Sequence, residues 1–260
     1  MSSPLDFTGR VALITGGSRG IGRGIAEAFL ASGADVAVCG RKAPDEFPSA
    51  GGKSAIFVGA DVRDAEQVEK MVDEVIERLG RLDVLVNNAG GAPFAEAATV
   101  SPRFSEKIVQ LNLTAALHCA QQANRVMQGQ DTGGSIINIA SVSGVRPSPG
   151  TAAYGAAKAG LINLSGTLAI EWGPKVRVNA ISASMILTEQ AHLHYGDDEG
   201  IARVAETVPL KRLGTPEDIA GACLFFASPL ASYVSGANLL LHGGGETPAF
   251  LSAATVNRGE

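Results

Sequence analysis

A tyrosine, a lysine and a serine occur in one short stretch of this chain at spacings that suit proton transfer. The Ala-rich run from about Ala152 predicts a helix on which Tyr154 and Lys158, four residues apart, share a face. A nearby ammonium favours phenolate, so we expect it to lower the pKa of the phenol from about 10 toward the range of efficient acid–base catalysis. Ser141 follows the apolar run 135–139, a predicted strand, and its hydroxyl could hold a substrate oxygen. Because the same Tyr–Lys spacing occurs on ordinary helices, the rest of the chain must decide whether it is catalytic.

A glycine-rich turn joins the first predicted strand to the first predicted helix. The apolar run 11–14 leads into TGGSRGIG at residues 15–22, and apolar residues at helical spacing follow. Such a turn lets the backbone approach a pyrophosphate, whose charge is met by amides at the helix N-terminus. The spacing is Gly-x-x-x-Gly-x-Gly rather than the common Gly-x-Gly-x-x-Gly, so the strand–turn–helix context carries the argument. The residues predicted to bind the cofactor here are Gly16, Ser18, Arg19, Gly20, Ile21 and Gly22.

Two cations follow the second predicted strand, residues 36–38. An enzyme selective for NAD usually places a carboxylate there against the ribose 2′-hydroxyl, but this chain continues with Cys39, Gly40, Arg41 and Lys42. Arg41 and Lys42 can pair with a 2′-phosphate, and Arg19 can add a third positive charge. The sequence therefore favours NADP(H) over NAD, with an ordinary solvated loop as the alternative.

The third and fourth predicted strands, residues 55–58 and 84–86, also end in candidate cofactor residues. Ligands of such sheets bind beyond the carboxyl ends of the strands. Asp61 and Val62 are therefore expected to meet the adenine. Asn88, Ala89 and Gly90 form a small-residue turn that could pass close under a nucleotide, although ordinary Asn/Gly turns have the same composition.

Composition indicates an α/β protein without nucleic-acid or membrane partners. The 260 residues are 45% hydrophobic and only 5% aromatic, with 32 glycines, and short β-branched runs alternate with Ala-rich amphipathic stretches in what we expect to be one domain, residues 1–260. A net charge of -5 without a basic run argues against nucleic acid and anionic membranes. No apolar segment approaches the roughly 18 residues of a membrane span, and the start lacks secretory-signal features, so we expect a cytoplasmic protein. The scattered cysteines and histidines predict neither a disulfide nor a metal site.

Two long apolar helices are predicted at residues 102–127 and from Ala152 to about Trp172. The first is apolar on most faces, and the second carries small residues beside Tyr154. Both are expected to form a subunit interface, with a larger core of one subunit as the alternative.

Several motifs in order resemble the short-chain dehydrogenase/reductase family, in particular its single-domain members like 3-oxoacyl-(acyl-carrier-protein) reductase. They are TGGSRGIG, NNAG, NLT around Asn112, the serine before YGAAK, and PLKRLGTPEDIA. The resemblance implies a Rossmann-type, doubly wound, seven-stranded parallel sheet with helices on both faces, and frequently a homotetramer. It also implies a catalytic set in which Tyr154 transfers the proton, Ser141 positions the substrate oxygen, Lys158 also binds the nicotinamide ribose, and Asn112 supports a relay water. Ile186 and Thr188 match the family positions that meet the carboxamide and the phosphate.

The chain departs from the family pattern after the sixth predicted strand, residues 176–181. Ala183 and Ser184 stand where the family has a Pro-Gly pair, so a rigid turn is lost. The family's usual Asp in the last strand is His242, and a tail, residues 246–260, follows. Residues 183–207 are expected to form a long irregular substrate lid that mixes apolar and acidic side chains.

These features predict an NADP(H)-dependent oxidoreductase that interconverts a secondary alcohol and a ketone on a lipophilic small molecule. A 3-oxoacyl thioester and a hydroxysteroid-like alcohol are equally compatible with the lid. From another class, a catalytically silent nucleotide sensor or scaffold on the same fold stays open. A sugar-nucleotide epimerase would need a longer C-terminal substrate domain.

Overall fold

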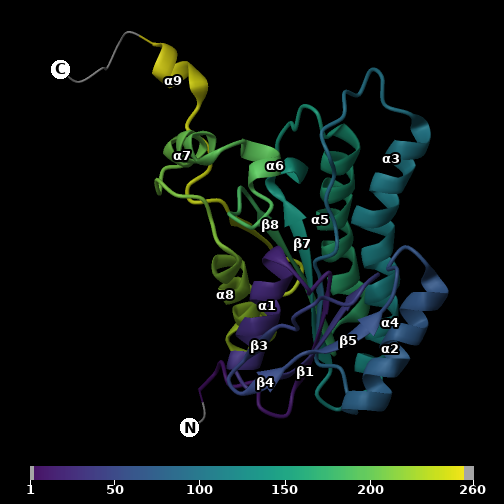
Figure 1. The fold of residues 1–260 in the computed structure, drawn as a ribbon. Coiled ribbons are helices and arrows are strands. Elements are labelled where there is room, and N and C mark those ends of the chain that lie inside the picture. The colour runs from purple at the N-terminus through teal and green to yellow at the C-terminus, as the bar shows by residue number, and fades with distance from the viewer. Residues whose placement is uncertain (1–2, 255–260) are drawn as a thin grey trace.

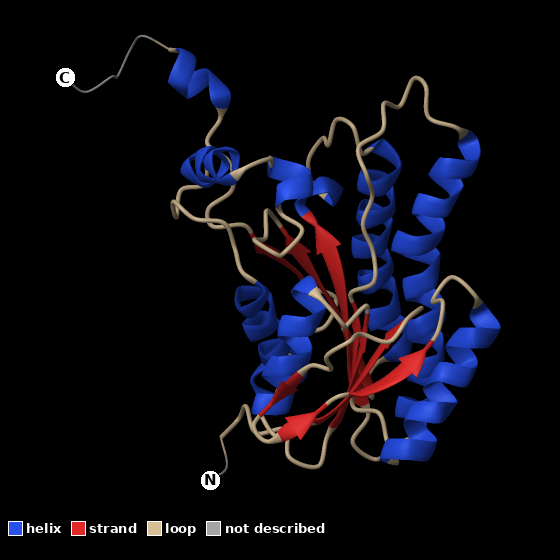
Figure 2. Cartoon of the chain, viewed as in Figure 1, coloured by secondary structure: helices blue, strands red, loops and turns tan. Residues whose placement is uncertain are grey.

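The computed structural model describes residues 3–254 and contains a seven-stranded parallel sheet with the strand order β5-β2-β1-β6-β7-β8-β9 (Figures 1 and 2). A separate two-stranded hairpin, β3-β4, was not predicted from the sequence. The strands are β1 (Val11–Thr15), β2 (Asp35–Gly40), β3 (Ser49–Ala50), β4 (Lys53–Ser54), β5 (Ile56–Gly59), β6 (Val84–Asn87), β7 (Gly134–Ser141), β8 (Val176–Ala183) and β9 (Asn238–Leu241). The expected Rossmann-type sheet is confirmed.

Helices cover both faces of the sheet (Figure 2). Helices α1 and α8 pack together on one face, and α2, α4 and α5 cover the other. The α-helices are α1 (Gly20–Ala31), α2 (Ala65–Leu79), α3 (Pro102–Val109), α4 (Ala115–Gly129), α5 (Ala152–Trp172), α6 (His192–Tyr195), α7 (Asp198–Thr207), α8 (Pro216–Ala227) and α9 (Ala249–Ala253). Short 3-10 turns occupy Val142–Gly144 and Pro229–Ala231.

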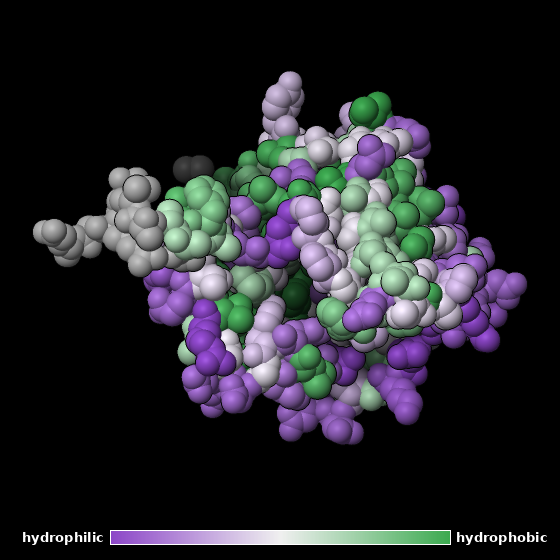
Figure 3. Space-filling view, turned by 90° about the horizontal axis from the view of Figure 1, so that it is seen from above, coloured by the Kyte–Doolittle hydropathy of each residue, from purple (hydrophilic) through white to green (hydrophobic). Residues whose placement is uncertain are grey.

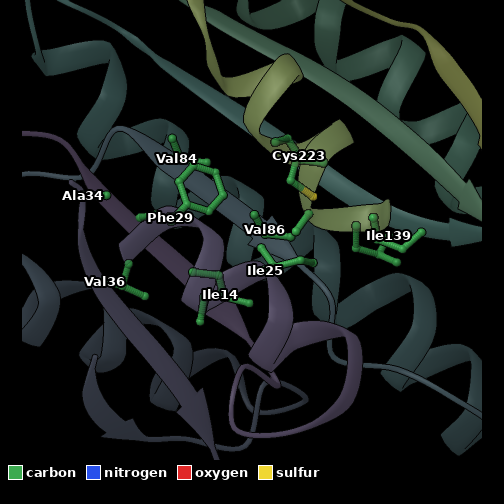
Figure 4. Close-up of a cluster of buried hydrophobic side chains, with 14 of the residues drawn as sticks. Ile14, Ile25, Phe29, Ala34, Val36, Val84, Val86, Ile139 and Cys223 are labelled. Carbon is green, nitrogen blue, oxygen red and sulfur yellow. The ribbon is translucent and has the colours of Figure 1, made fainter. Parts of the chain in front are cut away.

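The core consists of two apolar clusters, one on each face of the sheet. Figure 4 shows the cluster under α1 and α8, where Phe29 and Ile25 of α1 and Cys223 of α8 meet strand residues such as Ile14 and Val86. These side chains are almost completely buried. Parallel strands are buried on both faces, which is why their sequences are nearly continuous apolar runs rather than alternating ones.

Several element boundaries differ from those predicted. The third strand of the sheet begins at Ile56 rather than Ala55, and β8 continues past Ile181 to Ala183. The extension forms because Ser182 and Ala183 pair with β7 on one side and β9 on the other. A family proline at 183 would lack the amide hydrogen that such a ladder uses.

Two segments predicted as single elements are more complex. The helix expected over residues 102–127 is α3 followed by a π-helical turn, Gln110–Thr114, and α4. The lid expected to be irregular contains two helices, α6 and α7, so that expectation was wrong. Asp197 explains the second of them, since its side chain accepts a hydrogen bond from the Gly200 amide and caps α7.

The C-terminal segment leaves the sheet after β9. Helix α9 stands away from the sheet and its covering helices in Figure 1. The last part of the expected tail, residues 255–260, lies outside the described residues. Within residues 3–254, no helix is both long enough and apolar enough to cross a membrane.

Candidate active site

The candidate site lies at the carboxyl ends of the central strands. The order of the strands reverses between β1 and β6, and a doubly wound sheet binds ligands in the crevice at such a switch point. Figure 3 views this side of the molecule from above and shows a hollow near its centre with hydrophobic surface inside. Ser141 is the last residue of β7, and Tyr154 and Lys158 lie in the first turns of α5.

Lys158 and Tyr154 meet as their spacing predicts. The Lys158 ammonium lies 5.6 Å from the centre of the Tyr154 ring. It also donates a hydrogen bond of 2.8 Å to the Ile139 carbonyl of β7, and the lysine side chain is only 4% exposed. The Ser141 hydroxyl accepts the Ser143 amide at 3.1 Å and hydrogen-bonds to the Tyr154 phenol. These contacts bring three of the four expected catalytic residues together.

The electrostatics of the pair differ from the sequence-based expectation. Burial raises the pKa of Tyr154 above its ordinary value, and the hydrogen bond with Ser141 only partly opposes that rise. The expected lowering by Lys158 was wrong, because the ammonium lies over the ring face and is directed at the Ile139 carbonyl. Burial lowers the pKa of Lys158 from 10.5 to about 8. The phenol is therefore protonated at neutral pH.

Asn112 lies in the π-helical turn, which widens the helix at this point. Its side-chain amide donates to the carbonyls of Gly91, at 3.0 Å, and Ile108, at 2.9 Å. Its oxygen accepts the Gly91 amide at 2.8 Å. This clamp fixes the turn after β6 against the helix.

Gly90 shows how closely the clamp approaches the lysine. A Cβ atom built on Gly90 would lie 2.6 Å from Asn112 Oδ1 and 3.2 Å from Lys158 Nζ. Any side chain at this position would therefore clash with the site. All four expected catalytic residues and the Asn-Ala-Gly turn converge on one region.

The glycine turn fits a phosphate group. Gly16 and Gly20 have φ values of 63° and 52°, in the left-handed region that favours glycine. A Cβ on Gly22 would lie 2.3 Å from the Gly16 carbonyl oxygen, so this position also excludes a side chain. Arg19 precedes α1 without a side-chain cap, and the first turn of α1 has no acidic residue. Ser18 and Ile21 flank this uncapped helix start, whose amide groups are available to an anion.

Thr15, which the sequence analysis did not single out, ties the two small-residue turns together. Its buried hydroxyl accepts the amides of Asn88, at 2.9 Å, and Ala89, at 3.0 Å. The Asn88 side chain in turn donates to the carbonyls of Thr15 and Gly16. The only sequence signal was a hydroxyl residue at the end of an otherwise apolar strand.

The cations expected at the adenosine end lie at the ends of the outer strands. Arg41 and Lys42 follow β2, and both are exposed. Across residues 3–254, neither of them nor Arg19 forms an ion pair. Asp61, which follows β5 together with the buried Val62, is paired with Arg63. The sequence analysis missed this partner.

Residues near the start of the segment 183–207, which is expected to form the lid, lie beside the glycine turn. A Cβ on Gly20 would contact the Thr188 methyl group at 3.6 Å and a Glu189 carboxylate oxygen at 3.8 Å. Thr188 is thus placed near the glycine turn, and Glu189 brings an unexpected negative charge there. Ile186 is buried and bridges to Gly214 next to α8.

A cavity of about 100 Å³ adjoins Tyr154. Its walls are uncharged and come mainly from the loop after β6, from α3 and from the start of α5. The residues that line it include Ala92, Val100, Phe104, Ile108, Thr151 and Tyr154. A second cavity of about 180 Å³ lies at the base of the lid and is lined by Met185, Arg212 and His242, among others.

The C-terminal segment reaches the lid side of the site. Glu246 forms an ion pair with Arg146, which lies in the loop after Ser141. Thr247 donates hydrogen bonds to the carbonyl of Thr207 at the end of α7. Burial raises the pKa of Tyr195 in α6, and the nearby Tyr154 and Glu246 add to the rise. The lid side is thus more polar than the cavity beside Tyr154.

Known proteins resemble the chain along nearly its whole length. A family model described as enoyl-(acyl carrier protein) reductase matches residues 16–246. L-rhamnose 1-dehydrogenase (NAD(P)(+)) of Azotobacter vinelandii is 39% identical, covering 90% of this chain and 96% of its own. For 3-oxoacyl-[acyl-carrier-protein] reductase of Synechocystis the identity is 36%, with 92% and 97% covered.

A solved structure agrees with this sequence similarity. Ligand-free aldohexose dehydrogenase of Thermoplasma acidophilum superposes with a TM-score of 0.86 at 29% identity, covering 98% of this chain and 99% of its own. Together with the family model, this match covers both the sheet and the catalytic motifs. The chain therefore belongs to the short-chain dehydrogenase/reductase family and is an NAD(P)-dependent oxidoreductase that acts on CH–OH groups or the corresponding carbonyls.

Proposed function

We propose that the protein uses NADP(H) to interconvert a secondary alcohol and a ketone on a small substrate with a lipophilic body. The uncharged cavity beside Tyr154 carries this proposal, because the group that transfers the proton borders a space without a charged wall. A 3-oxoacyl thioester and a hydroxysteroid-like alcohol both have such a body. The alternative of a catalytically silent sensor or scaffold finds no support in the comparisons.

The cofactor preference rests on the charges at the end of β2. Arg41 and Lys42 are exposed cations without ion-pair partners among the described residues. No carboxylate lies at residues 39–42 to repel a 2′-phosphate. Guanidinium groups bind phosphates through charge-assisted, often bidentate, hydrogen bonds. Asp61 and Val62 would line the adenine side.

In the reductive direction, NADPH, when bound, would supply the hydride that the carbonyl carbon accepts. Tyr154 donates its phenol proton to the carbonyl oxygen, which the Ser141 hydroxyl holds in place. The raised pKa of Tyr154 suits a proton donor, because the phenol is protonated at neutral pH before the substrate arrives. Lys158, which lies beside the ring, stabilises the phenolate that remains and would hold the nicotinamide ribose of the bound cofactor. Asn112 clamps the turn after β6 beside Lys158, where a water that restores the proton would bind.

A substrate screen tests the proposal. NADPH oxidation is followed by absorbance with ketones of increasing apolar size, and NADP⁺ reduction is followed with the matching alcohols. We expect kcat/KM to rise with apolar size until the cavity beside Tyr154 is full. Phe104→Asp, which places a charge in the wall of that cavity, should abolish this rise in kcat/KM, while Phe225→Asp, at an exposed position of α8 outside the cavity, serves as a control. Activity on none of the lipophilic compounds would contradict the substrate class.

A polyhydroxylated substrate is the second candidate. The names L-rhamnose 1-dehydrogenase and D-threitol dehydrogenase, the latter for a relative 36% identical to this chain, point to sugars and polyols. The Arg146–Glu246 pair and Tyr195 would supply donors and acceptors for such hydroxyl groups on the lid side. Including aldoses and alditols in the screen decides between the two classes.

A homotetramer in the cytoplasm is the expected working form. Ile170 of α5 is 86% exposed, and the edge strand β9 exposes Leu239 and Leu240. Apolar side chains on a long helix and on a sheet edge suit burial against further copies of the chain. Sedimentation velocity at several protein concentrations tests the assembly.

The three buried free cysteines suit a reducing compartment such as the cytoplasm. Residues 1–260 would then act as one domain, with 183–207 as its lid.

A further inference from the structure

Arg63 holds Asp61 in a two-pronged ion pair at the adenosine end of the site. Arg63 Nε lies 2.9 Å from Asp61 Oδ1, and Arg63 Nη2 lies 2.5 Å from Asp61 Oδ2. The Arg63 amide also donates to Oδ1 at 3.1 Å. Both carboxylate oxygens are therefore engaged by the same residue two positions along the chain. Bidentate pairs of this kind are the strong members of their class.

Arg41 is a second cation whose charge acts on the Asp61 carboxylate. The pKa of Asp61 is lowered mainly by its hydrogen bonds to Arg63 and, to a smaller extent, by the charge of Arg41. Asp61 therefore stays ionised, and its charge is balanced by Arg63 rather than by protonation. Arg41 itself has no ion-pair partner among residues 3–254 and is exposed. Gly40 of β2 pairs with Gly59 of β5, and the Gly40 carbonyl accepts the Ala60 amide at 3.0 Å, so Arg41 and Asp61 leave two adjacent strand ends. Without Arg63, the carboxylate would act on Arg41.

We propose that Arg63 is a positioning residue for cofactor selectivity: it occupies Asp61 so that Arg41 stays free to bind the 2′-phosphate of NADP(H). The inference rests on the proposed preference for NADP(H) and names the residue that maintains it. Removing Arg63 leaves an uncompensated carboxylate that competes for Arg41 and repels the 2′-phosphate. Both effects act on NADPH and not on NADH, which lacks that phosphate.

A purely structural role predicts a different result. An ion pair that only stabilises the loop after β5 would affect both cofactors equally when broken, because adenine and ribose are common to them. An Arg63 side chain that obstructs the adenine would give tighter binding of both cofactors when it is shortened. The ratio of the two dissociation constants therefore separates selectivity from structure.

The experiment measures the dissociation constants of NADPH and NADH for the native protein, Arg63→Gln, Asp61→Asn and the double variant. We expect Arg63→Gln to lower the preference for NADPH about three- to tenfold, while NADH binding changes less than about twofold. Asp61→Asn in the Arg63→Gln background should restore the preference, because the competing charge is gone. Arg125→Gln, which breaks the exposed Arg125–Asp73 pair between α4 and α2, removes the same charge as a control.

Each outcome bears on one claim. Equal affinity of the native protein for both cofactors would refute the proposed NADP(H) preference itself. A native preference that Arg63→Gln leaves unchanged, or that the double variant fails to recover, would overturn the role of Arg63 alone. If Arg63→Gln does not fold, the dissociation constants of NADPH and NADH are measured for Arg63→Lys instead. A single ammonium cannot engage both oxygens in the same fork, so the preference should fall about twofold. An unchanged preference in that variant would also overturn the inference.

Discussion

The buried charge of Lys158 lowers the free energy of unfolding, and Lys158→Met should show by how much. The ammonium is buried, and its pKa falls from 10.5 to about 8 because burial disfavours the charged form. Each unit of pKa shift corresponds to about 1.4 kcal/mol. The folded protein is therefore destabilised by roughly 3 kcal/mol at any pH at which the lysine is charged in both the folded and the unfolded state. Methionine of similar length has no charge to desolvate, but it loses the hydrogen bond to Ile139, which costs about 1–3 kcal/mol. The variant should match or exceed the native stability at pH 7 while losing turnover.

The pH dependence gives the sharper measurement. Between pH 8 and 10.5 the unfolded lysine keeps its proton and the folded one releases it, so the unfolded state binds more protons and native stability rises with pH. Relative to Lys158→Met, the native protein should therefore gain about 2–3 kcal/mol between pH 7 and pH 10. Contributions from other titrating groups cancel to first order in this difference.

Urea unfolding at fixed protein concentration provides the assay, with fluorescence of the single tryptophan, Trp172, as the probe. Trp172 packs against the core cluster on the α5 face, so it reports loss of that packing. Lys70→Met, at an exposed lysine of α2, controls for loss of a positive charge as such. A difference between native and Lys158→Met protein that does not change with pH would refute the reasoning, whatever its size at pH 7.

Four further changes test the site. Tyr154→Phe should keep NADPH binding but lose a factor of at least about 10² in turnover, since only the transferable proton is removed; turnover within a few-fold of native would exclude the assignment. Arg41→Ala should weaken NADPH about ten- to a hundredfold and leave NADH unchanged, as measured by titration. Glu189→Gln should raise the affinity for both cofactors about two- to fivefold, because it removes a negative charge beside the glycine turn. Unchanged dissociation constants would show that the carboxylate moves away on binding. Ala183→Pro with Ser184→Gly should lower the unfolding free energy by about 1–3 kcal/mol and weaken NADPH binding, because a strand hydrogen bond is lost. Tighter NADPH binding would show that the family's Pro-Gly turn forms here too.

Local patterns were enough to predict the parts of the site that lie within one segment. Tyr154 and Lys158 meet because four residues make one helical turn, and the glycine turn follows from a strand that runs directly into a helix. The order of the strand ends then brings Ser141 beside them. These relations depend on sequence spacing and on the regular geometry of helices and parallel sheets.

Relations between distant segments were not predictable in this way. Thr15 joins two turns more than seventy residues apart, and Glu189 reaches the glycine turn from the lid. The raised pKa of Tyr154 depends on how much of the folded protein surrounds the ring, which spacing does not encode. The pairing of Asp61 with Arg63 is local, but its proposed effect on cofactor selectivity depends on Arg41, which follows another strand.

The replacement of the family Pro-Gly pair shows how a local change acts through the sheet. The Ala180 amide donates to Ala237, just before β9, and the Ser184 amide donates to Leu241 of β9. Alternation along β8 therefore turns the Ala183 amide toward β7, where Ala183 pairs with Ser141. A proline at 183 has no amide hydrogen to give, and β8 would end earlier. Here the strand holds the end of β7 that carries the candidate catalytic serine. Because the Ser184 amide is also bonded, to the Leu241 carbonyl at 3.1 Å, the segment expected to form the lid starts from a fixed base, and a movement of that segment on cofactor binding would have to begin beyond Ser184.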